Sequence, residues 1–241
     1  MTLSHLAADL GPGVTAVFTR ARADDGRPFN LSLTVGDTEH AVHDRALLDR
    51  WLGTPATFAR QVHGAHVHVC GAGEEGAGPV EADALIGTRR GVAVGVLVAD
   101  CVPVLLADPA AGVIGAVHAG RRGLVAGVVG EAVRAMVAHG AQRLSAVLGP
   151  SICGACYEVP AAMQREVADV VPGTASTTTA GTPGLDLRAG VRWQLDRAGV
   201  ADVTVVEACT FEDDAWFSHR GAGPGRPEGR FAAVVALLPE G

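Results

Sequence analysis

Three short apolar runs stand close together in the middle of the chain and predict buried strands. They span Val92–Ala99, Val102–Ala107 and Val113–Val117. Runs of this length, bounded by Gly, Pro and Asp, are typical of strands in a sheet core. The Asp108-Pro109 step predicts a turn between the second run and the third. Because Cys101 separates the first two runs and His118 follows the third, we expect a thiol and an imidazole at the ends of buried strands.

Helical and strand-like periodicity continues on both sides of this stretch. Helices are predicted over Thr38–Trp51, Leu124–His139, Pro160–Val170 and Asp186–Gly199, and strands over Val14–Thr19, Leu144–Leu148, Val203–Val206 and Phe231–Leu238. The segments Gly71–Pro79 and Pro172–Gly184 are expected to be loops because they are rich in Gly, Ser, Thr and Pro. No repeat or change of composition divides the chain, so we predict one domain over residues 1–241.

The first two predicted helices each have an apolar face. In the first, that face consists of Val42, Leu47, Leu48 and Trp51, whereas His43, Asp44 and Arg45 are expected on the solvated side. In the second, the buried stripe consists of Leu124, Val125, Val128, Val129, Val133, Met136 and Val137.

Composition limits the structures and functions open to the chain. Hydrophobic residues make up 48% and aromatic residues 4%, which favours an α/β protein with a core of small aliphatic side chains. All 19 basic residues are arginine, which excludes a Schiff-base lysine and the P-loop lysine. A net charge of −7 with scattered basic residues argues against a nucleic-acid partner. We expect no membrane span and no signal peptide, and five cysteines then suggest the cytoplasm.

His63, Cys101 and His118 are the main candidates for chemistry. Each lies at the start or end of a predicted strand, so three loops could converge at one end of a sheet. One Cys with two His is a catalytic zinc set that leaves a fourth position open for water or substrate. Cys101 and His118 alone also fit a nucleophile–base pair, and burial as inert core residues is a third interpretation.

Two cysteine-containing patterns carry weaker signals. His66, His68 and Cys70 alternate along one strand and could hold a metal ion. Side chains in a row on one strand suit tetrahedral binding poorly, which favours a polar outer face. Cys153 and Cys156 form a C-x-x-C pair. The pair lacks the thioredoxin-like context of a redox motif, and no second C-x-x-C accompanies it to hold a structural zinc ion.

The turn Gly120-Arg121-Arg122-Gly123 precedes a predicted helix. Unpaired backbone N–H groups at a helix start favour anions, and arginine adds charge-assisted donors for phosphate. A solvated basic turn is the alternative interpretation.

Motifs spread over most of the chain resemble one known family, the YfiH-type laccase-domain proteins. The strongest are Gln61-Val62-His63-Gly64, Ala99-Asp100-Cys101-Val102-Pro103 and Val117-His118-Ala119-Gly120; Gly149-Pro150-Ser151-Ile152, Cys156-Tyr157-Glu158-Val159, Leu185-Asp186-Leu187, Cys209-Thr210 and Phe217-Ser218-His219-Arg220 are also similar. Three departures accompany the likeness. Arg121 stands where the family usually has Trp, Cys153 stands where Gly is more usual, and the motif around 21–28 is degraded.

The resemblance implies a layered αββα sandwich with mixed sheets and one zinc ion held by His63, Cys101 and His118. It implies phosphorolysis of adenosine, inosine and S-methyl-5'-thioadenosine, together with deamination of adenosine. The implied partners are therefore purine nucleosides and phosphate. Older descriptions of relatives imply two alternatives, a copper-dependent polyphenol oxidase and a Cys–His hydrolase that edits peptidoglycan precursors.

Roles for the remaining residues follow from this reading. Arg122 is our candidate for holding phosphate, with Arg45 as a second choice. Gln61 and Arg121 are expected to contact substrate. The candidates for the acid–base group are Gln61, Asp100, Glu158 and His219.

Overall fold

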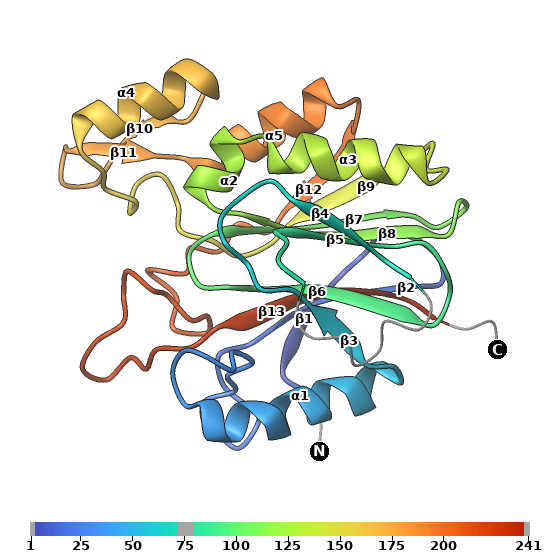
Figure 1. Cartoon of the computed structure of the whole chain (residues 1–241). Helices are drawn as coiled ribbons and strands as arrows, with labels where there is room; N and C mark the ends of the chain where they lie inside the picture. Colours follow the sequence, from blue (N-terminus) through green and yellow to red (C-terminus); the bar gives the residue numbers. More distant parts are fainter. Residues whose placement is uncertain (1–2, 72–79, 239–241) are drawn as a thin grey trace.

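Two mixed β-sheets lie face to face, and helices cover the outer face of each (Figure 1). The computed structural model describes residues 3–71 and 80–238. The predicted loop Gly71–Pro79 falls mostly on residues 72–79, which lie outside the described part of the chain. The predicted layered αββα class is confirmed. The prediction of one domain over 1–241 stays a prediction.

The first sheet has five strands in the order β1-β2-β13-β6-β3. Their bounds are His5–Ala8 (β1), Val14–Thr19 (β2), Phe231–Leu237 (β13), Val92–Val98 (β6) and Ala56–Phe58 (β3). The edge strand β3 runs parallel to β6, and the other pairs are antiparallel. The last strand of the chain is therefore central in this sheet, where Figure 1 shows it beside β6.

The second sheet has six strands in the order β12-β9-β7-β8-β5-β4. Their bounds are Asp202–Val205 (β12), Ser145–Leu148 (β9), Val102–Asp108 (β7), Val113–Ala119 (β8), Ala84–Gly87 (β5) and Val67–Cys70 (β4). The outer pairs β12–β9 and β4–β5 are parallel, and the inner pairs are antiparallel. The three central runs are strands as predicted, but the first of them, β6, lies in the other sheet.

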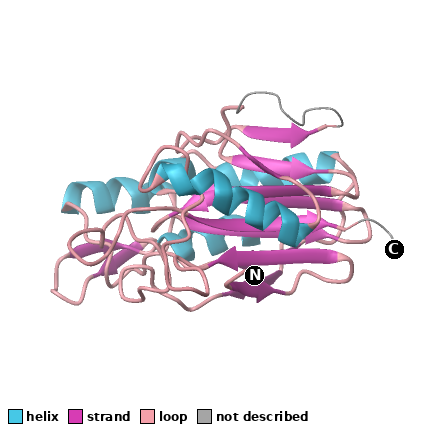
Figure 2. Ribbon diagram, turned by 90° about the horizontal axis from the view of Figure 1, so that it is seen from below, coloured by secondary structure: helices cyan, strands magenta, loops and turns pink. Residues whose placement is uncertain are grey.

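Helix α1 (Thr38–Leu52) covers the outer face of the five-stranded sheet, where Figure 2 shows it in front of the strands. The other helices are α2 (Arg121–Val125), α3 (Val128–Ala138), α4 (Ala161–Val170) and α5 (Leu187–Arg197). Asp186 caps α5 as predicted, because its side chain accepts the Ala189 N–H. No helix within the described ranges combines the length and apolar composition that crossing a bilayer requires.

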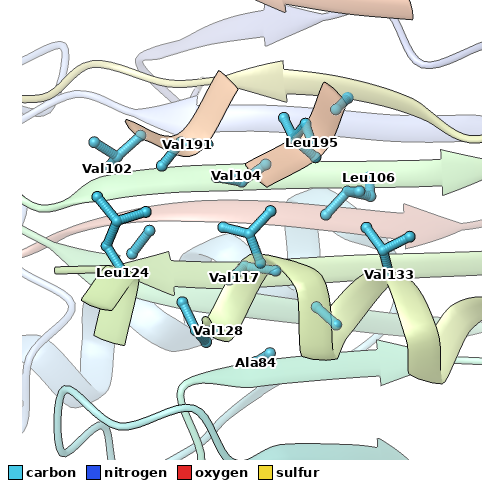
Figure 3. Close-up of a cluster of buried hydrophobic side chains, with 14 of the residues drawn as sticks. Ala84, Val102, Val104, Leu106, Val117, Leu124, Val128, Val133, Val191 and Leu195 are labelled. Carbon is cyan, nitrogen blue, oxygen red and sulfur yellow. The ribbon is translucent and has the colours of Figure 1, made fainter. Parts of the chain in front are cut away.

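Three clusters of buried side chains fill the spaces between the four layers. Figure 3 shows the cluster between the six-stranded sheet and its helices. In it, Val104 and Val117 of the sheet contact Val133 of α3 and Leu195 of α5. A second cluster lies between the sheets, and a third lies between the five-stranded sheet and α1. Both faces of each central strand are therefore covered, which explains the continuous apolar runs.

The predicted faces of α1 are partly wrong. Val42 and Trp51, expected in the core, are 65% and 38% exposed. Asp44, expected in solvent, is fully buried, and its carboxylate lies 2.7 Å from Nη1 of Arg27, which comes from the preceding loop. Arg45 is half-buried instead of solvated. Helical spacing alone could not show that a distant arginine would neutralise this face.

Three further predictions need correction. The helix expected over 124–139 is divided between α2 and α3 at Gly127, whose φ is +85°, and Val137 is 55% exposed. The segment 172–184 contains most of a hairpin, β10 (Ala175–Thr177) with β11 (Pro183–Leu185), to which Gln164 of α4 donates two hydrogen bonds. Cys70 is buried between the sheets, so the face it shares with His68 is not a polar outer face.

Asp108, at the end of β7, offers a test of fold stability. Its buried carboxylate accepts backbone N–H groups of Ala111, Gln142 and Arg143. Burial raises the pKa of this group, but those amides outweigh burial and hold the pKa below its ordinary value. Because the folded pKa is lowered, the stabilisation is present above pH about 4 and is lost as pH falls through the folded pKa.

We expect Asp108→Asn to lower the free energy of unfolding by about 1–3 kcal/mol at pH 7, since buried N–H groups lose charged acceptors. Urea denaturation would measure this, and the difference from the parent should shrink below pH about 4. The exposed Asp169→Asn is the control, expected within about 0.5 kcal/mol of the parent. An unchanged unfolding free energy for Asp108→Asn would contradict this account.

Candidate metal centre

His63, Cys101 and His118 converge at one end of the two sheets. His63 lies on the link from β3 to β4, and Cys101 lies on the link from β6 to β7; both links pass from the five-stranded sheet to the six-stranded sheet. His118 is on β8, opposite Pro103 of β7. The centre therefore forms where the chain crosses twice between the sheets, as the sequence analysis expected of converging loops.

Each of these two links contains a non-glycine residue with positive φ, which is a rare backbone conformation. His63 has φ +60° and Asp100, directly before Cys101, has φ +85°. Non-glycine residues adopt positive φ at an energetic cost, and such residues concentrate at functional sites. The surrounding hydrogen bonds hold both residues in this conformation.

Asp83, the residue directly before β5, positions the candidate ligands through its buried carboxylate. One carboxylate oxygen lies 2.8 Å from Nδ1 of His118 and accepts the His63 N–H at 2.9 Å. The other accepts the Gly64 N–H at 2.7 Å and the Val62 N–H at 3.2 Å. Asp83 is fully buried, and burial raises its pKa. The His118 ring and these amides outweigh burial and hold the pKa below its ordinary value.

This arrangement fixes the orientation of His118. Because Nδ1 of the ring faces Asp83, Nε2 faces Cys101. Carboxylate–histidine pairs of this form orient metal-binding imidazoles in many proteins. Sequence reasoning missed Asp83; the available signal was a carboxylate directly before a buried apolar strand.

The ligand atoms of His63, Cys101 and His118 lie within 4.8 Å of one another. Sγ of Cys101 is 3.8 Å from Nε2 of His63, and the two imidazole rings meet edge to face with centroids 4.7 Å apart. Burial raises the pKa of the Cys101 thiol, but His118 and His63 outweigh it and lower that pKa to about 6. Burial likewise lowers the pKa of His118, but Cys101 and Asp83 raise it to about 9.

The backbone leaves room for this group at Gly120. A Cβ atom placed there would lie 2.6 Å from Cδ2 of His63 and 3.0 Å from Sγ of Cys101. One thiolate and two imidazoles form the borderline-soft donor set that suits zinc, and they leave a fourth vertex. The residues present therefore fit one mononuclear ion.

We expect Gly120→Ala to lower zinc affinity by roughly 10–100-fold, because the new methyl group must displace two ligands. Competition with a chromophoric chelator would measure the affinity. Gly130→Ala in α3 is the matched control, since a Cβ there meets nothing within 4 Å. Equal zinc affinity in both variants would contradict the proposed ligand positions.

A cavity of about 640 Å³ opens onto the three candidates. Its wall carries six arginines: Arg45, Arg60, Arg121, Arg122, Arg220 and Arg230. Among the described residues that line it, Asp100 is the one with an acidic side chain. A concentration of arginine in a protein of net charge −7 makes this cavity suitable for an anionic ligand.

Arg121 and Arg122 occupy the first turn of α2 and line this cavity as expected. Arg45 also lines it, with its Nε donating to the Leu31 carbonyl at 2.8 Å and its guanidinium 4.8 Å from the Phe58 ring centroid. Burial lowers the pKa of Arg45.

Gln61 lines the cavity, but its amide is engaged on both sides. Its oxygen accepts the Leu97 N–H, and its nitrogen donates to the Leu97 carbonyl, each at 2.8 Å. The Gln61 side chain therefore joins the loop that carries His63 to β6 through the same pair of hydrogen bonds that a neighbouring strand would make.

The acid–base candidates differ in their surroundings. Asp100 accepts hydrogen bonds from Thr210 and Ser218 hydroxyls and from the Arg220 N–H, each at 2.7 Å. Glu158 is exposed and does not belong to the cavity lining, whereas His219 does. Asp100 thus holds the Cys101 turn in place, and His219 places an exposed imidazole at the cavity.

Within the described ranges, a second group that could hold a metal ion consists of Cys153, Cys156, Cys209 and Glu212. The C-x-x-C pair alone does not predict a structural zinc site, because Cys209 is distant from it in the sequence. Burial and the adjacent thiols raise the pKa of Cys156 and Cys209.

Comparison with known proteins identifies the family. The profile of a family described as multi-copper polyphenol oxidoreductase laccase matches residues 15–238. The chain belongs to this family. The sequence resemblance to the YfiH-type laccase-domain proteins is thereby confirmed.

Relatives and solved structures of this laccase-domain family extend over most of the chain. A purine nucleoside phosphorylase of Streptomyces griseus is 49% identical over 216 residues, covering 87% of each chain. An adenosine deaminase from an unknown prokaryotic organism is 34% identical, covering 88% of this chain and 90% of the relative. The YlmD structure from Geobacillus stearothermophilus superposes with TM-score 0.84 at 30% identity, covering 95% of this chain and 93% of the other.

The hypothetical protein YfiH of Bacillus licheniformis also has this fold, with TM-score 0.85 at 27% identity over 98% of this chain and 97% of its own. The family description speaks of several copper ions. In the described part of this laccase-domain chain, neither candidate metal group has more than two histidines. These donor sets suit single ions.

Proposed function

We propose that the protein is a zinc-dependent purine nucleoside phosphorylase that acts on adenosine, inosine and S-methyl-5'-thioadenosine. The supporting observation is one cavity in which a Cys–His–His group and six arginines face the same space. Phosphorolysis needs a bound phosphate beside the sugar, and arginine provides bidentate donors for it. The relative from Streptomyces griseus, named a purine nucleoside phosphorylase, supports the same reaction.

Each residue has a distinct part in this proposal. Arg122 holds phosphate, Arg45 assists it, and Arg121 contacts the base where the family usually has Trp. His219 donates a proton to the departing purine, because its ring is exposed at the cavity. When bound to His63, Cys101 and His118, zinc supplies a Lewis acid and lowers the pKa of a water to about 7, which suits adenosine deamination.

Incubation with nucleosides tests this proposal. Purified protein loaded with zinc, adenosine and phosphate should yield adenine and ribose 1-phosphate by chromatography, and arsenate should replace phosphate. Inosine appearing without phosphate would report deamination. The parallel copper-loaded sample with a phenol distinguishes the oxidase alternative. Unchanged adenosine, inosine and S-methyl-5'-thioadenosine would refute the proposal.

We expect Arg122→Ala to raise the KM for phosphate about tenfold or more, with a smaller change in the KM for adenosine. The reason is the loss of a charge-assisted hydrogen bond worth about 1.5–3 kcal/mol. Initial rates at varied phosphate would measure this. The exposed Arg165→Ala of α4 is the control and should match the parent. An unchanged phosphate KM in Arg122→Ala would remove this residue from the proposed site.

A Cys–His hydrolase is the second candidate, because Cys101, His118 and Asp83 form a nucleophile–base–orienting series. It predicts activity without metal and loss of that activity when Cys101 is alkylated. Since both candidates need Cys101 as a thiolate, we propose a reducing compartment, the cytoplasm, for the protein.

A further inference from the structure

Two turns of the same form meet beside the cavity. In the first, the N–H groups of Cys156 and Tyr157 both donate to the Cys153 carbonyl, at 3.0 Å. In the second, the N–H groups of residues 212 and 213 both donate to the Cys209 carbonyl, at 3.2 and 3.0 Å. Each turn therefore presents two potential ligands three positions apart, as C-x-x-C and as C-x-x-E.

We propose that Cys153, Cys156, Cys209 and Glu212 form a second, structural zinc site, separate from the His63–Cys101–His118 group. The four ligand atoms lie within 4.8 Å of one another. Tetrahedral zinc with ligands at about 2.0–2.3 Å needs ligand atoms about 3.3–3.8 Å apart, so small side-chain movements suffice. Structural zinc sites bind through two ligand pairs of this spacing, and three thiols favour zinc over Mg²⁺ or Ca²⁺.

The backbone around Cys209 is arranged for a thiolate. The N–H of Cys153 points at Sγ of Cys209 at a distance of 3.4 Å. N–H donors to sulfur stabilise the negative charge of a metal-bound thiolate. The thiols are half-buried and Glu212 is exposed, which gives an ion a route from solvent and closes the site on the protein side.

The two turns are aligned by backbone contacts and by Arg188, without the side chains of the four proposed ligands. Ser151 pairs with Cys209 in a parallel bridge, and its N–H donates to the Ala208 carbonyl at 3.3 Å. Arg188 of α5 donates to the Ser151 hydroxyl at 2.7 Å and to the Ala208 carbonyl. The site is therefore preorganised by buried hydrogen bonds, and zinc would lock an arrangement that already exists.

Zinc at this position would fix two parts of the cavity wall together. Ile152 and Tyr157, on either side of the first turn, both line the cavity. Thr210, inside the second turn, donates to Asp100, the residue before Cys101. A bound ion would therefore hold the wall and the Cys101 turn in register without touching substrate.

The zinc content of the purified full-length chain, measured by inductively coupled plasma mass spectrometry, tests this site. We expect two zinc ions per chain in the parent, one in Cys101→Ser, one in Cys209→Ser and none in the double variant. Cys70→Ser is the control, because Cys70 belongs to neither group, and it should retain two. Retention of the parent zinc content in Cys209→Ser would overturn the proposal. A single ion that Cys101→Ser retains and Cys209→Ser loses would support it, even if the first group binds none.

Cobalt substitution gives a second readout that leaves all four proposed ligands of the second site in place. In Cys101→Ser, cobalt should give the intense thiolate-to-metal absorption of several sulfur ligands, and its absence would overturn the site. Glu212→Gln should release zinc to a chelator faster than the parent, whereas the exposed neighbour Asp214→Asn should not. A disulfide among these thiols in protein purified without oxidant would also overturn the proposal.

Discussion

His118→Ala is expected to abolish phosphorolysis and to remove the zinc ion of the His63–Cys101–His118 group. The ring of His118 is one of three proposed ligands, and the pair it forms with Asp83 aims Nε2 at Cys101. Loss of a ligand should cost more than the roughly 10–100-fold that loss of an outer partner costs. Zinc content and the rate of adenine formation from adenosine and phosphate measure the two effects.

His43→Ala provides the control, since His43 is exposed on α1. That variant should keep parental zinc content and rate. Circular dichroism should confirm that His118→Ala remains folded, because its buried ring leaves space behind. Phosphorolysis at the parental rate in a folded His118→Ala protein would show that this group is not the centre of the reaction.

Asp83→Asn is expected to lower zinc affinity and activity by roughly 10–100-fold each. The carboxylate orients His118 and accepts the His63 and Gly64 N–H groups. The NH₂ group of the asparagine would lie against backbone N–H groups, where neither side can accept a hydrogen bond. This should also lower the free energy of unfolding by about 1–3 kcal/mol. Chelator competition measures the affinity, and saturating zinc should restore part of the activity.

Asp108→Asn is the matched control for this variant. Asp108 is equally buried and also accepts several backbone N–H groups, but it lies at the far end of β7 from Cys101. It should lower stability without changing zinc affinity. If both variants lost stability alike and neither changed zinc affinity, Asp83 would have only a structural part.

The strands around the candidate site could be predicted because the sheets bury both of their faces. Val92–Val98, Val102–Asp108 and Val113–Ala119 read as continuous apolar runs for that reason. Their division between two sheets left no local signal, since β6 pairs with β13 and β7 pairs with β9. Pairings between distant segments depend on tertiary packing, which periodicity does not encode.

The candidate site was predicted to a similar depth. The motifs around His63, Cys101 and His118 predict that these side chains lie together, as they do. They give no sign of Asp83, whose partners are mostly backbone N–H groups that any residue could supply. The C-x-x-C pair lacks, for a similar reason, any local sign of the other two ligands of a zinc site. Its complement at Cys209 lies 53 positions beyond Cys156 and has a carboxylate in place of the fourth thiol.

The links from β3 to β4 and from β6 to β7 connect the packing between the sheets to the candidate metal centre. His63 and Cys101 lie on links that lead from the five-stranded sheet into the six-stranded sheet, so their positions depend on how the two sheets pack. Protein interiors transmit small volume changes because they are densely packed. A substitution deep between the sheets, such as Leu105→Ala, should therefore disturb the proposed zinc coordination at a lower temperature than the one at which the protein unfolds. Heat inactivation should then precede unfolding, and the enzyme would lose turnover while still native by circular dichroism.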